Sequence, residues 1–466
     1  MKKLGRRDFI KGVTAGVAAT SAGMGHLAFS EKSSPQQRSG YDKPPNIILI
    51  YADDLGYGDL STYGHPAIKT PNIDRLGEEG VRFTEFYVTC PVCTPSRASL
   101  LTGRYQARSG LYRVIWPESY GYQGWNTGIS HYELTLAEML KPSGYATQII
   151  GKWHLGNLPQ FHPQKHGFDH FLGLLHSNDM DPVYLFRDEK ILFDGENLMD
   201  NPKQGELGKI YTEEAKKFIG ENKNRPFFLY FPHTYPHKPL YVPDEFRGKS
   251  KAGIYGDVIE YFDWSVGEIV KTVDELGLAE ETLIIFTSDN GPYMPTSTPE
   301  SPGGLRGSKS TLWDGGIKVP MLARWRGRIP AGSVCDDVAV TMDLFTTIIN
   351  IAGGTIPQDR HIDGKDIMPL LDGTGAVLHE ELFFFQQELL GSARFGKWKI
   401  HVGEVRRRGQ RSSRRVSPEN PELYDLENDP AENKNVAEQH PELVKKFANR
   451  IKEFLKEIEA EKASRS

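Results

Sequence analysis

Residues 46–59 read NIILIYADDLGYGD, a short apolar run that ends in two adjacent aspartates. Further apolar runs of strand length recur along the chain, at residues 145–151, 226–232, 282–289 and 320–325. Amphipathic stretches separate them, and in residues 255–277 the apolar side chains recur at close to helical spacing. Alternating strands and helices predict an α/β domain in which a large, mainly parallel sheet is covered by helices on both faces.

The pattern changes after about residue 375. Residues 379–402 are typical of short hairpin strands, residues 419–430 of a further strand and turn, and residues 439–461 of a charged terminal helix. We therefore predict a main domain over residues 44–374 and a smaller α+β subdomain with a short antiparallel sheet over residues 375–466.

The composition excludes several classes of protein. Of the 466 residues, 25% are charged and 38% hydrophobic, as in a soluble globular protein. The formal net charge of −5 gives no reason to expect nucleic acid as a partner. Three cysteines are too few for a disulfide framework or a four-thiolate zinc site.

The N-terminus has the pattern of an export signal. Residues 1–30 contain Arg6 and Arg7, a weakly apolar run and a small-x-small pattern at residues 28–30, which predict a signal peptide of the twin-arginine type. The alternative is a chance arginine pair before a frayed helix. Residues 31–43 are polar and predict a linker. We expect export through the twin-arginine machinery and a periplasmic or secreted protein. No later run approaches the roughly eighteen apolar residues of a membrane span, so no integral span is expected.

Polar side chains follow two of the predicted strands. Asp53 and Asp54 end the first run, and Asp289 and Asn290 end the run that begins at residue 282. The carboxyl ends of parallel strands border the ligand crevice of an open sheet, so these four side chains are expected to meet. Their oxygens suit Ca²⁺ or Mg²⁺. Either pair alone is explained as a helix or turn cap, but the two together favour a metal site.

Residues 90–105 read CPVCTPSRASLLTGRY. The C-x-x-C spacing matches a redox dithiol, but such motifs accompany a small βαβ unit and this chain is far larger. Thr94 fits a helix N-cap and Pro95 the first helical position, with the helix continuing to Gly103. Cys93 then lies at a helix N-terminus, where free N–H groups and Arg97 favour an anion. A nucleophile derived from Cys93 acting on an anionic ester fits this arrangement.

The segment 93–103, CTPSRASLLTG, resembles the signature of the sulfatase family. The likeness extends over most of the mature chain, through GKWHLG (151–156), HSNDM (176–180), YPHKPL (235–240) and LRGSKS (305–310). Within the formylglycine-dependent type I sulfatases, the chain is most similar to arylsulfatase A and its relatives. The resemblance implies an alkaline phosphatase-like fold and a sulfuric ester hydrolase acting on aryl sulfates in vitro and on sulfated carbohydrates in nature.

The resemblance also implies roles for individual residues. Cys93 matches the cysteine that a formylglycine-generating maturation enzyme converts to Cα-formylglycine, whereas Cys90 lies outside the motif. One Ca²⁺ ion is expected on Asp53, Asp54, Asp289 and Asn290. The catalytic residues implied are Cys93, Arg97, Lys152, His154, His237 and Lys309. The substrate-binding residues implied are Ser177, Lys152, His237 and Lys309. His233 competes with His237, which has the family's H-x-P spacing.

The mechanism that the resemblance implies uses the hydrated aldehyde. One hydroxyl of the gem-diol, deprotonated with help from Asp289, attacks sulfur, and His237 or Lys309 protonates the leaving alcohol. His154 then deprotonates the second hydroxyl, which expels sulfate. Twin-arginine export of folded protein is compatible with modification of Cys93 before export.

Other interpretations stay open at this point. A phosphodiesterase or phosphonate monoester hydrolase of the same superfamily is the nearest alternative, and a catalytically silent binder of sulfated glycans is another. The arginine-rich segment 405–416, with six arginines from Arg406 to Arg415, fits either contact with a polyanionic substrate or a solvated loop. Four histidines and one tryptophan are interpreted as structural: His65, His162, His166, His170 and Trp153.

Overall fold

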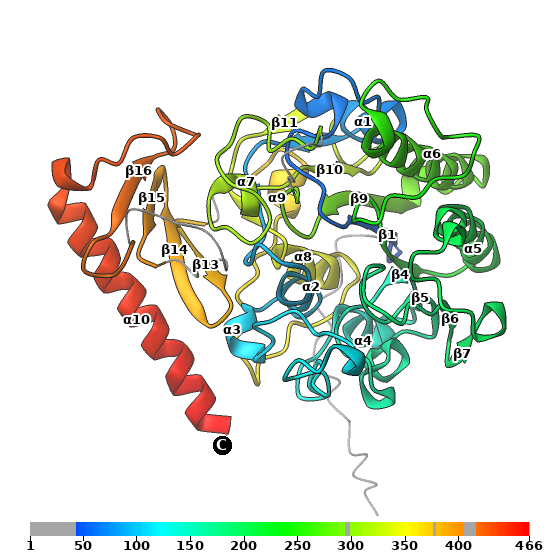
Figure 1. Cartoon of the computed structure of the whole chain (residues 1–466), viewed down its shortest axis with the longest axis horizontal. Helices are drawn as coiled ribbons and strands as arrows, with labels where there is room; N and C mark the ends of the chain where they lie inside the picture. Colours follow the sequence, from blue (N-terminus) through cyan, green and yellow to red (C-terminus); the bar gives the residue numbers. More distant parts are fainter. Residues whose placement is uncertain (1–42, 294–298, 376–378, 404–415, 466) are drawn as a thin grey trace, which may run out of the picture. The chain divides into compact units, whose positions relative to one another are not determined.

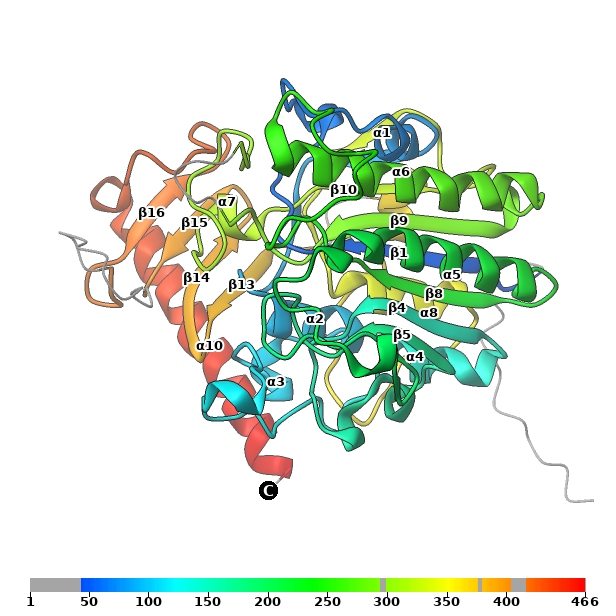
Figure 2. The same ribbon diagram turned by 45° about the vertical axis from the view of Figure 1, so that its right-hand side comes forward.

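A ten-stranded sheet forms the centre of the computed structural model, which describes residues 43–293, 299–375, 379–403 and 416–465 (Figures 1 and 2). The strand order is β11-β2-β10-β9-β1-β8-β4-β5-β6-β7. The five central strands are parallel: β9 (Thr282–Ser288), β1 (Asn46–Ala52), β8 (Phe227–Pro232), β4 (Ala146–Lys152) and β5 (His170–Leu174). The predicted mainly parallel sheet is confirmed.

The outer strands make the sheet mixed. The strand β10 pairs antiparallel with both β9 and β2, and β11 pairs parallel with β2. At the other edge, β6 pairs antiparallel with β5 and β7. These strands are β2 (Val81–Phe83), β6 (Phe186–Arg187), β7 (Lys190–Ile191), β10 (Met321–Arg324) and β11 (Ser333–Cys335). A separate pair of parallel strands consists of β3 (Phe86–Tyr87) and β12 (Ala339–Val340).

The apolar run of β1 is continuous because both faces of the sheet are covered. Ile47 and Leu49 pack into one hydrophobic core, and Ile48 and Ile50 pack into the other. One core is closed by α1 (Pro71–Glu78), α5 (Leu207–Asn222) and α6 (Gly253–Glu275), and Figure 2 shows α5 and α6 in front of the sheet. The other is closed by α2 (Cys93–Thr102), α4 (Leu136–Leu140) and α8 (Asp343–Ile351). Shorter helices are α3 (Gln106–Ser109), α7 (Asp314–Ile317) and α9 (Met368–Leu371).

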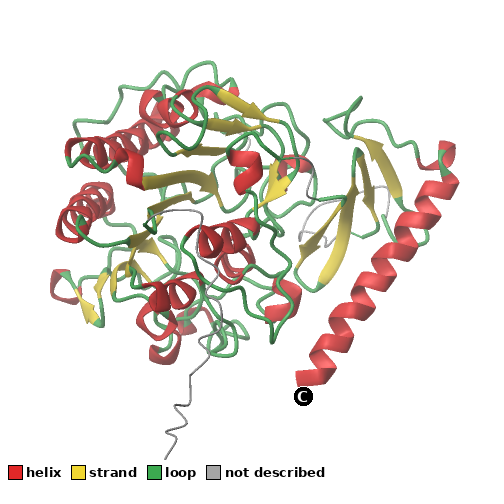
Figure 3. Cartoon of the chain, turned by 180° about the vertical axis from the view of Figure 1, so that it is seen from behind, coloured by secondary structure: helices red, strands yellow, loops and turns green. Residues whose placement is uncertain are grey.

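The C-terminal region forms the predicted antiparallel sheet, in the order β13-β14-β15-β16, with a long helix against it (Figure 3). The elements are β13 (Glu381–Gln386), β14 (Leu389–Phe395), β15 (Trp398–His401), β16 (Glu422–Asp425) and α10 (Pro441–Arg465). Phe454 of α10 stacks on Phe383 with ring centroids 3.8 Å apart, and Phe447 stacks on Phe395 at 4.3 Å. The predicted boundary at residue 375 lies between α9 and β13.

Three expectations fall outside the described residues. The predicted signal peptide and nearly all of the predicted linker lie within residues 1–42, and the arginines from Arg406 to Arg415 lie within residues 404–415. No helix in the described ranges is long and apolar enough to cross a lipid bilayer.

A buried charged network joins the C-terminal sheet to the loop before β10. The carboxylate of Glu432 accepts hydrogen bonds from the backbone N–H of Asp314 at 2.7 Å and from Nε2 of His401 at 2.9 Å. The Lys399 ammonium lies 3.0 Å from Glu432 and 2.6 Å from Asp314. All four side chains are buried. The C-terminal subdomain therefore holds one end of the loop 305–314.

We expect Glu432→Ala to lower the free energy of unfolding by about 3–5 kcal/mol, because it leaves the charge of Lys399 buried with one partner fewer. The matched control is Glu388→Ala, since Glu388 pairs with Arg113 at 2.9 Å but its side chain is 52% exposed. That control should cost at most about 1 kcal/mol. Urea unfolding measures both, and equal losses in the two variants would contradict the assignment.

Candidate active site

The parallel strands bring most of the predicted site residues to one edge of the sheet. Ala52 pairs with Ser288 and Tyr51 with Pro232, so β1, β8 and β9 end at the same level. The residues that end or follow β1, β4, β8 and β9 here are Asp53, Asp54, Lys152, His154, His237, Asp289 and Asn290. The carboxyl ends of the strands thus form a charged site, as the crevice rule for open sheets predicts.

The backbone at this edge is held in uncommon conformations. Asp54 and His154 have φ values of +66° and +59°, in the left-handed region that costs non-glycine residues about 1–3 kcal/mol. The N–H of Asp54 donates to Oδ1 of Asp289 at 3.1 Å, which ties two strand ends together. A Cβ at Gly151 would lie 1.9 Å from the carbonyl oxygen of Pro232, so only glycine lets β4 approach β8 just before Lys152.

Three carboxylates and three cations form an ion-pair cluster in the site. The ion pairs are Lys152 with Asp53 at 2.7 Å, Lys309 with Asp54 at 2.6 Å, and Arg97 with Asp289 at 2.7 Å. Five of these side chains are buried and that of Lys309 is 11% exposed. With all six groups ionised, the cluster has no net charge.

The pKa values of Asp53 and Asp289 are shifted in opposite directions, although burial raises both. Burial raises the pKa of Asp53, but Lys152, His237 and Arg97 outweigh it and hold that pKa well below its usual value. Burial and the adjacent charge of Asp53 raise the pKa of Asp289 to about 7, against the opposing effect of Arg97. Asp53 therefore stays ionised at neutral pH, whereas the pKa of Asp289 lies close to neutral pH.

Two side-chain oxygens in the site, one on Asp53 and one on Asn290, are suited to bind a cation. Oδ1 of Asp53 and Oδ1 of Asn290 are buried and accept no hydrogen bond, whereas Nδ2 of Asn290 donates to Asp54 at 2.8 Å. Ligand atoms of Asp53, Asp54 and His237 also lie within 4.8 Å of one another. Carboxylate and amide oxygens that accept no hydrogen bond are the donors that Ca²⁺ prefers, so the residues present fit that ion. The imidazole of His237 lies against the same carboxylates, a proximity that the sequence did not indicate.

Cys93 lies at the N-terminus of α2, beside these charges. Its side chain is buried, and burial raises the pKa of the thiol while Lys152 and Lys309 oppose that rise. The helix begins at Cys93 itself, so the prediction that Thr94 caps it is wrong. The hydroxyl of Thr94 instead donates to the carbonyl oxygen of His154 at 3.0 Å. The guanidinium of Arg97, one turn along, donates to the carbonyl oxygen of Lys152 at 3.1 Å.

His154 and Ser177 complete the surroundings of Lys152. Nε2 of His154 donates to the carbonyl oxygen of Ile115 at 2.9 Å, and its Nδ1 is buried without a hydrogen bond. Burial, followed by the charge of Lys152, holds the pKa of His154 well below its usual value, so the ring is neutral with an available lone pair. The hydroxyl of Ser177 accepts from the Lys152 ammonium at 3.2 Å. The sequence did not indicate Ile115 as a site residue, because it holds His154 through its backbone carbonyl and not through its side chain.

His237 and its competitor His233 lie in different environments. Nε2 of His237 is 3.5 Å from Asp54, and its Nδ1 is 2.6 Å from the carbonyl oxygen of Lys238. His233 is buried against aromatic rings, with the rings of Tyr235 and Phe262 at 4.5 and 4.6 Å. Burial lowers the pKa of His233 to about 3. The geometry therefore brings His237, and not His233, to the charged cluster.

These environments predict different consequences for the two histidines. We expect His237→Ala to lower kcat/KM for 4-nitrophenyl sulfate roughly 10²–10⁴-fold, as for loss of a group that handles protons. His233→Ala removes a packed ring and should instead lower the melting temperature. Steady-state kinetics and thermal unfolding of both variants separate the effects. A larger kinetic loss in the folded His233 variant would reverse the assignment.

The histidines interpreted as structural lie in other surroundings. Nδ1 of His65 accepts two backbone N–H groups in its own turn, and His166 stacks on Trp153 with centroids 6.1 Å apart. His170 pairs with Asp188 at 3.7 Å in a cleft of about 710 Å³.

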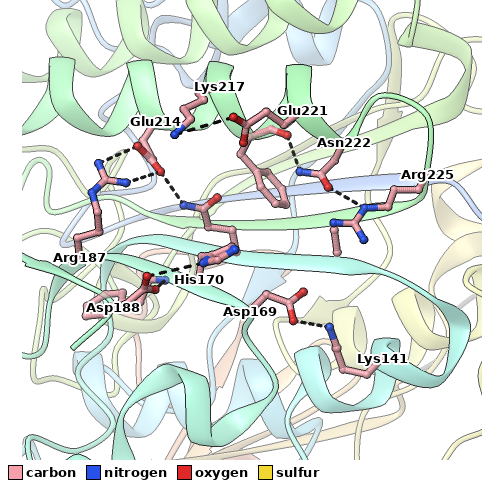
Figure 4. Close-up of a pocket in the computed structure, with 14 residues that line it drawn as sticks. Lys141, Asp169, His170, Arg187, Asp188, Glu214, Lys217, Glu221, Asn222 and Arg225 are labelled. Carbon is pink, nitrogen blue, oxygen red and sulfur yellow. Dashed lines mark hydrogen bonds and ion pairs between the residues drawn. The ribbon is translucent and has the colours of Figure 1, made fainter. Parts of the chain in front are cut away.

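That cleft, drawn in Figure 4, lies at the opposite ends of the strands, beside the first residues of β4 and β5. Most of its charged side chains are paired with one another. Arg187 pairs with Glu214 at 2.8 Å, and Lys141 pairs with Asp169 at 2.6 Å. The cleft therefore has no group resembling the nucleophile and free ligand oxygens of the strand-end site.

Comparison with known proteins identifies the family. Residues 45–354 match the sulfatase family model, and residues 308–461 match the model of the C-terminal part of N-sulphoglucosamine sulphohydrolase. Human N-acetylgalactosamine-6-sulfatase is 42% identical over 382 residues, which cover 78% of this chain and 72% of that protein. Human arylsulfatase A is 39% identical over 431 residues, covering 84% and 83%.

A solved sulfatase structure has the same fold as this chain. The PsFucS1 sulfatase from Pseudoalteromonas sp. superposes with a TM-score of 0.79 and 28% identity, covering 90% of this chain and 91% of that one. The family expected from the signature is thus confirmed, together with the sulfatase fold and the class of reaction, hydrolysis of sulfate esters. The chain belongs to the sulfatase family.

Proposed function

We propose that this sulfatase hydrolyses sulfate monoesters of carbohydrates, using Cα-formylglycine made from Cys93 and one Ca²⁺ ion. The observation that carries the proposal is the position of residue 93. It lies at the N-terminus of α2 beside Lys152 and Lys309, next to carboxylates and an amide with two buried oxygens that accept no hydrogen bond. A sulfate group placed there meets cations on several sides.

Asp53, Asp54, Asp289 and Asn290 would hold the calcium ion. When both groups are in place, the formylglycine supplies the hydroxyl nucleophile and the ion draws charge from the sulfate oxygens. The side-chain cluster alone is formally neutral, so a divalent ion would make the site attractive to an anion. Lys309 and Lys152 would then bind sulfate oxygens, with Ser177 beside Lys152.

The remaining residues handle protons and orientation. Arg97 holds Oδ2 of Asp289 with two hydrogen bonds, at 2.7 and 3.2 Å, and so fixes that carboxylate close to residue 93. In its protonated form the imidazole of His237 can give a proton from Nε2 to the leaving oxygen. Burial and Lys309 lower the pKa of His237, which makes this protonated form a stronger acid. The neutral His154 ring, held by Ile115, offers Nδ1 as a proton acceptor.

Sulfated carbohydrate is proposed as the natural substrate because the relative with 42% identity is an N-acetylgalactosamine-6-sulfatase. The test is a panel of 4-nitrophenyl sulfate, 4-nitrophenyl phosphate and a phosphonate monoester, extended to N-acetylgalactosamine 6-sulfate. We expect the highest kcat/KM on sulfate esters. Preference for the phosphonate would favour the phosphonate monoester hydrolase alternative. Binding of sulfated glycans without turnover by formylglycine-containing protein would favour a silent binder.

Export through the twin-arginine machinery, after modification of Cys93, is the corresponding proposal for location. It is supported by Arg6 and Arg7 and the run that follows them. Replacing both arginines with lysine should leave the protein in the cytoplasmic fraction, and unchanged export would contradict the proposal.

A further inference from the structure

Three aromatic side chains form a cluster on the loop that follows α3. Trp116 lies 5.1 Å from Tyr120 and 5.2 Å from Tyr122 between ring centroids, and the two tyrosine rings are stacked with an interplanar angle of 15°. Tyr120 is 37% exposed and Tyr122 is 54% exposed. We call these three residues the aromatic platform. Rings that pack on one another and stay open to solvent contribute little to a core, and such exposure is typical of binding surfaces.

One end of the aromatic platform is tied to the residues around Cys93. The residue before Trp116 is Ile115, whose carbonyl oxygen accepts from His154 at 2.9 Å. The backbone N–H of Ile115 donates to the hydroxyl of Thr94 at 3.3 Å. Trp116 therefore directly follows Ile115, whose backbone contacts His154 and Thr94, the residue after Cys93.

The other end of the aromatic platform is tied to the sulfate-binding segment. The hydroxyl of Tyr120 contacts the carbonyl oxygen of Asp179 at 3.4 Å and accepts from the N–H of Asp181 at 3.1 Å. Asp179 follows Ser177 by two residues, so their Cα atoms are at most about 7.6 Å apart. Ser177 in turn accepts from Lys152. The aromatic platform is thus connected, through Ile115 and through Tyr120, to two segments that border the site.

We propose that the aromatic platform binds the pyranose ring of the substrate's leaving group by stacking, with Tyr122 as its most exposed contact. The proposal rests on the sulfatase function proposed above and specifies its substrate class. A pyranose has a face of C–H groups with partial positive charge, which complements the negative face of an aromatic ring. A sulfated sugar therefore matches the site at both ends, with its anion on the lysines and its C–H face on the rings.

The test uses full-length, formylglycine-containing protein and the Tyr122→Ala variant. Tyr122 is chosen because Tyr120 also orders the segment 179–181 through its hydroxyl. The substrates are 6-sulfated N-acetylgalactosamine, N-acetylglucosamine and galactose, and inorganic sulfate serves as a competitive inhibitor. Tyr122→Ala should raise KM for the preferred sugar sulfate roughly 3- to 10-fold, while the inhibition constant of inorganic sulfate changes less than about twofold.

Two matched variants define the effect. Tyr122→Phe keeps the ring and should restore the KM of the unsubstituted protein. Tyr132→Ala removes another exposed tyrosine ring, 42% exposed, that packs on Arg360 instead, and should leave KM unchanged. An unchanged KM in Tyr122→Ala would overturn the proposal. So would a parallel rise in the inhibition constant of sulfate, because the ring would then act through the sulfate site.

Failure of the underlying function gives a different result. Protein that hydrolyses 4-nitrophenyl sulfate but none of the sugar sulfates overturns the proposal for the aromatic platform and leaves the sulfatase intact. Formylglycine-containing protein that hydrolyses no sulfate ester overturns the proposed function itself.

Discussion

Replacing Cys93 with alanine is expected to lower kcat for 4-nitrophenyl sulfate by at least about 10⁴-fold, because the variant has no side chain from which the nucleophile can be made. The fold should survive. The substitution removes one buried sulfur atom from the first residue of α2, and the hydrogen bonds of Thr94 and Arg97 that fix this helix do not involve it. The measurements are steady-state kinetics and the melting temperature of the same preparations.

Cys90 provides the matched control for this prediction. It is also buried, three residues before Cys93, and burial raises the pKa of its thiol. Cys90→Ala should keep the activity of the unsubstituted protein. Mass spectrometry of the peptide that spans Cys93 should show the aldehyde in place of the thiol. Full turnover by Cys93→Ala, or an unmodified Cys93 thiol in active enzyme, would contradict the formylglycine assignment.

The strands were predictable because β1 and β8 are apolar at nearly every position and β4 and β9 contain shorter apolar runs. In β1, successive side chains enter the two cores on opposite faces, and a continuous apolar run is the direct consequence. The meeting of Asp53 with Asp289 followed from the same topology, since parallel strands end at one edge. These features depend on the order of elements along the chain and not on the details of packing.

Other features of the site depend on contacts between distant segments. Thr94 was predicted as a cap from local propensity, but its hydroxyl accepts from the N–H of Ile115 and donates to the carbonyl oxygen of His154. The helix starts at Cys93, two residues before the predicted first helical position at Pro95. The support of the loop that contains Lys309 comes from Glu432, 118 residues further along than Asp314. Because Asp314 and Glu432 are so far apart in the sequence, no local sequence pattern can indicate that they are in contact.

Removing calcium is expected to abolish turnover and to lower the melting temperature. Without the ion, Oδ1 of Asp53 and Oδ1 of Asn290 stay buried without a hydrogen bond, and the cluster has no net positive charge to hold a sulfate ester. A ligand at 100 times its Kd stabilises a folded protein by about 2.7 kcal/mol, so adding Ca²⁺ to chelated protein should raise the melting temperature in a concentration-dependent way.

Asn290→Ala provides the sharper test of the same site, because it removes one neutral ligand oxygen and leaves all three carboxylates in place. We expect this variant to need a higher Ca²⁺ concentration than the unsubstituted protein for the same rise in melting temperature, and for half-maximal turnover. Asp244→Asn removes a carboxylate whose side chain is fully exposed and should not change either titration. If chelation changes neither melting temperature nor turnover, or if Asn290→Ala titrates like the unsubstituted protein, these residues do not bind calcium. The ion pairs of Lys152, Lys309 and Arg97 with the three carboxylates would then be the charge arrangement of the site.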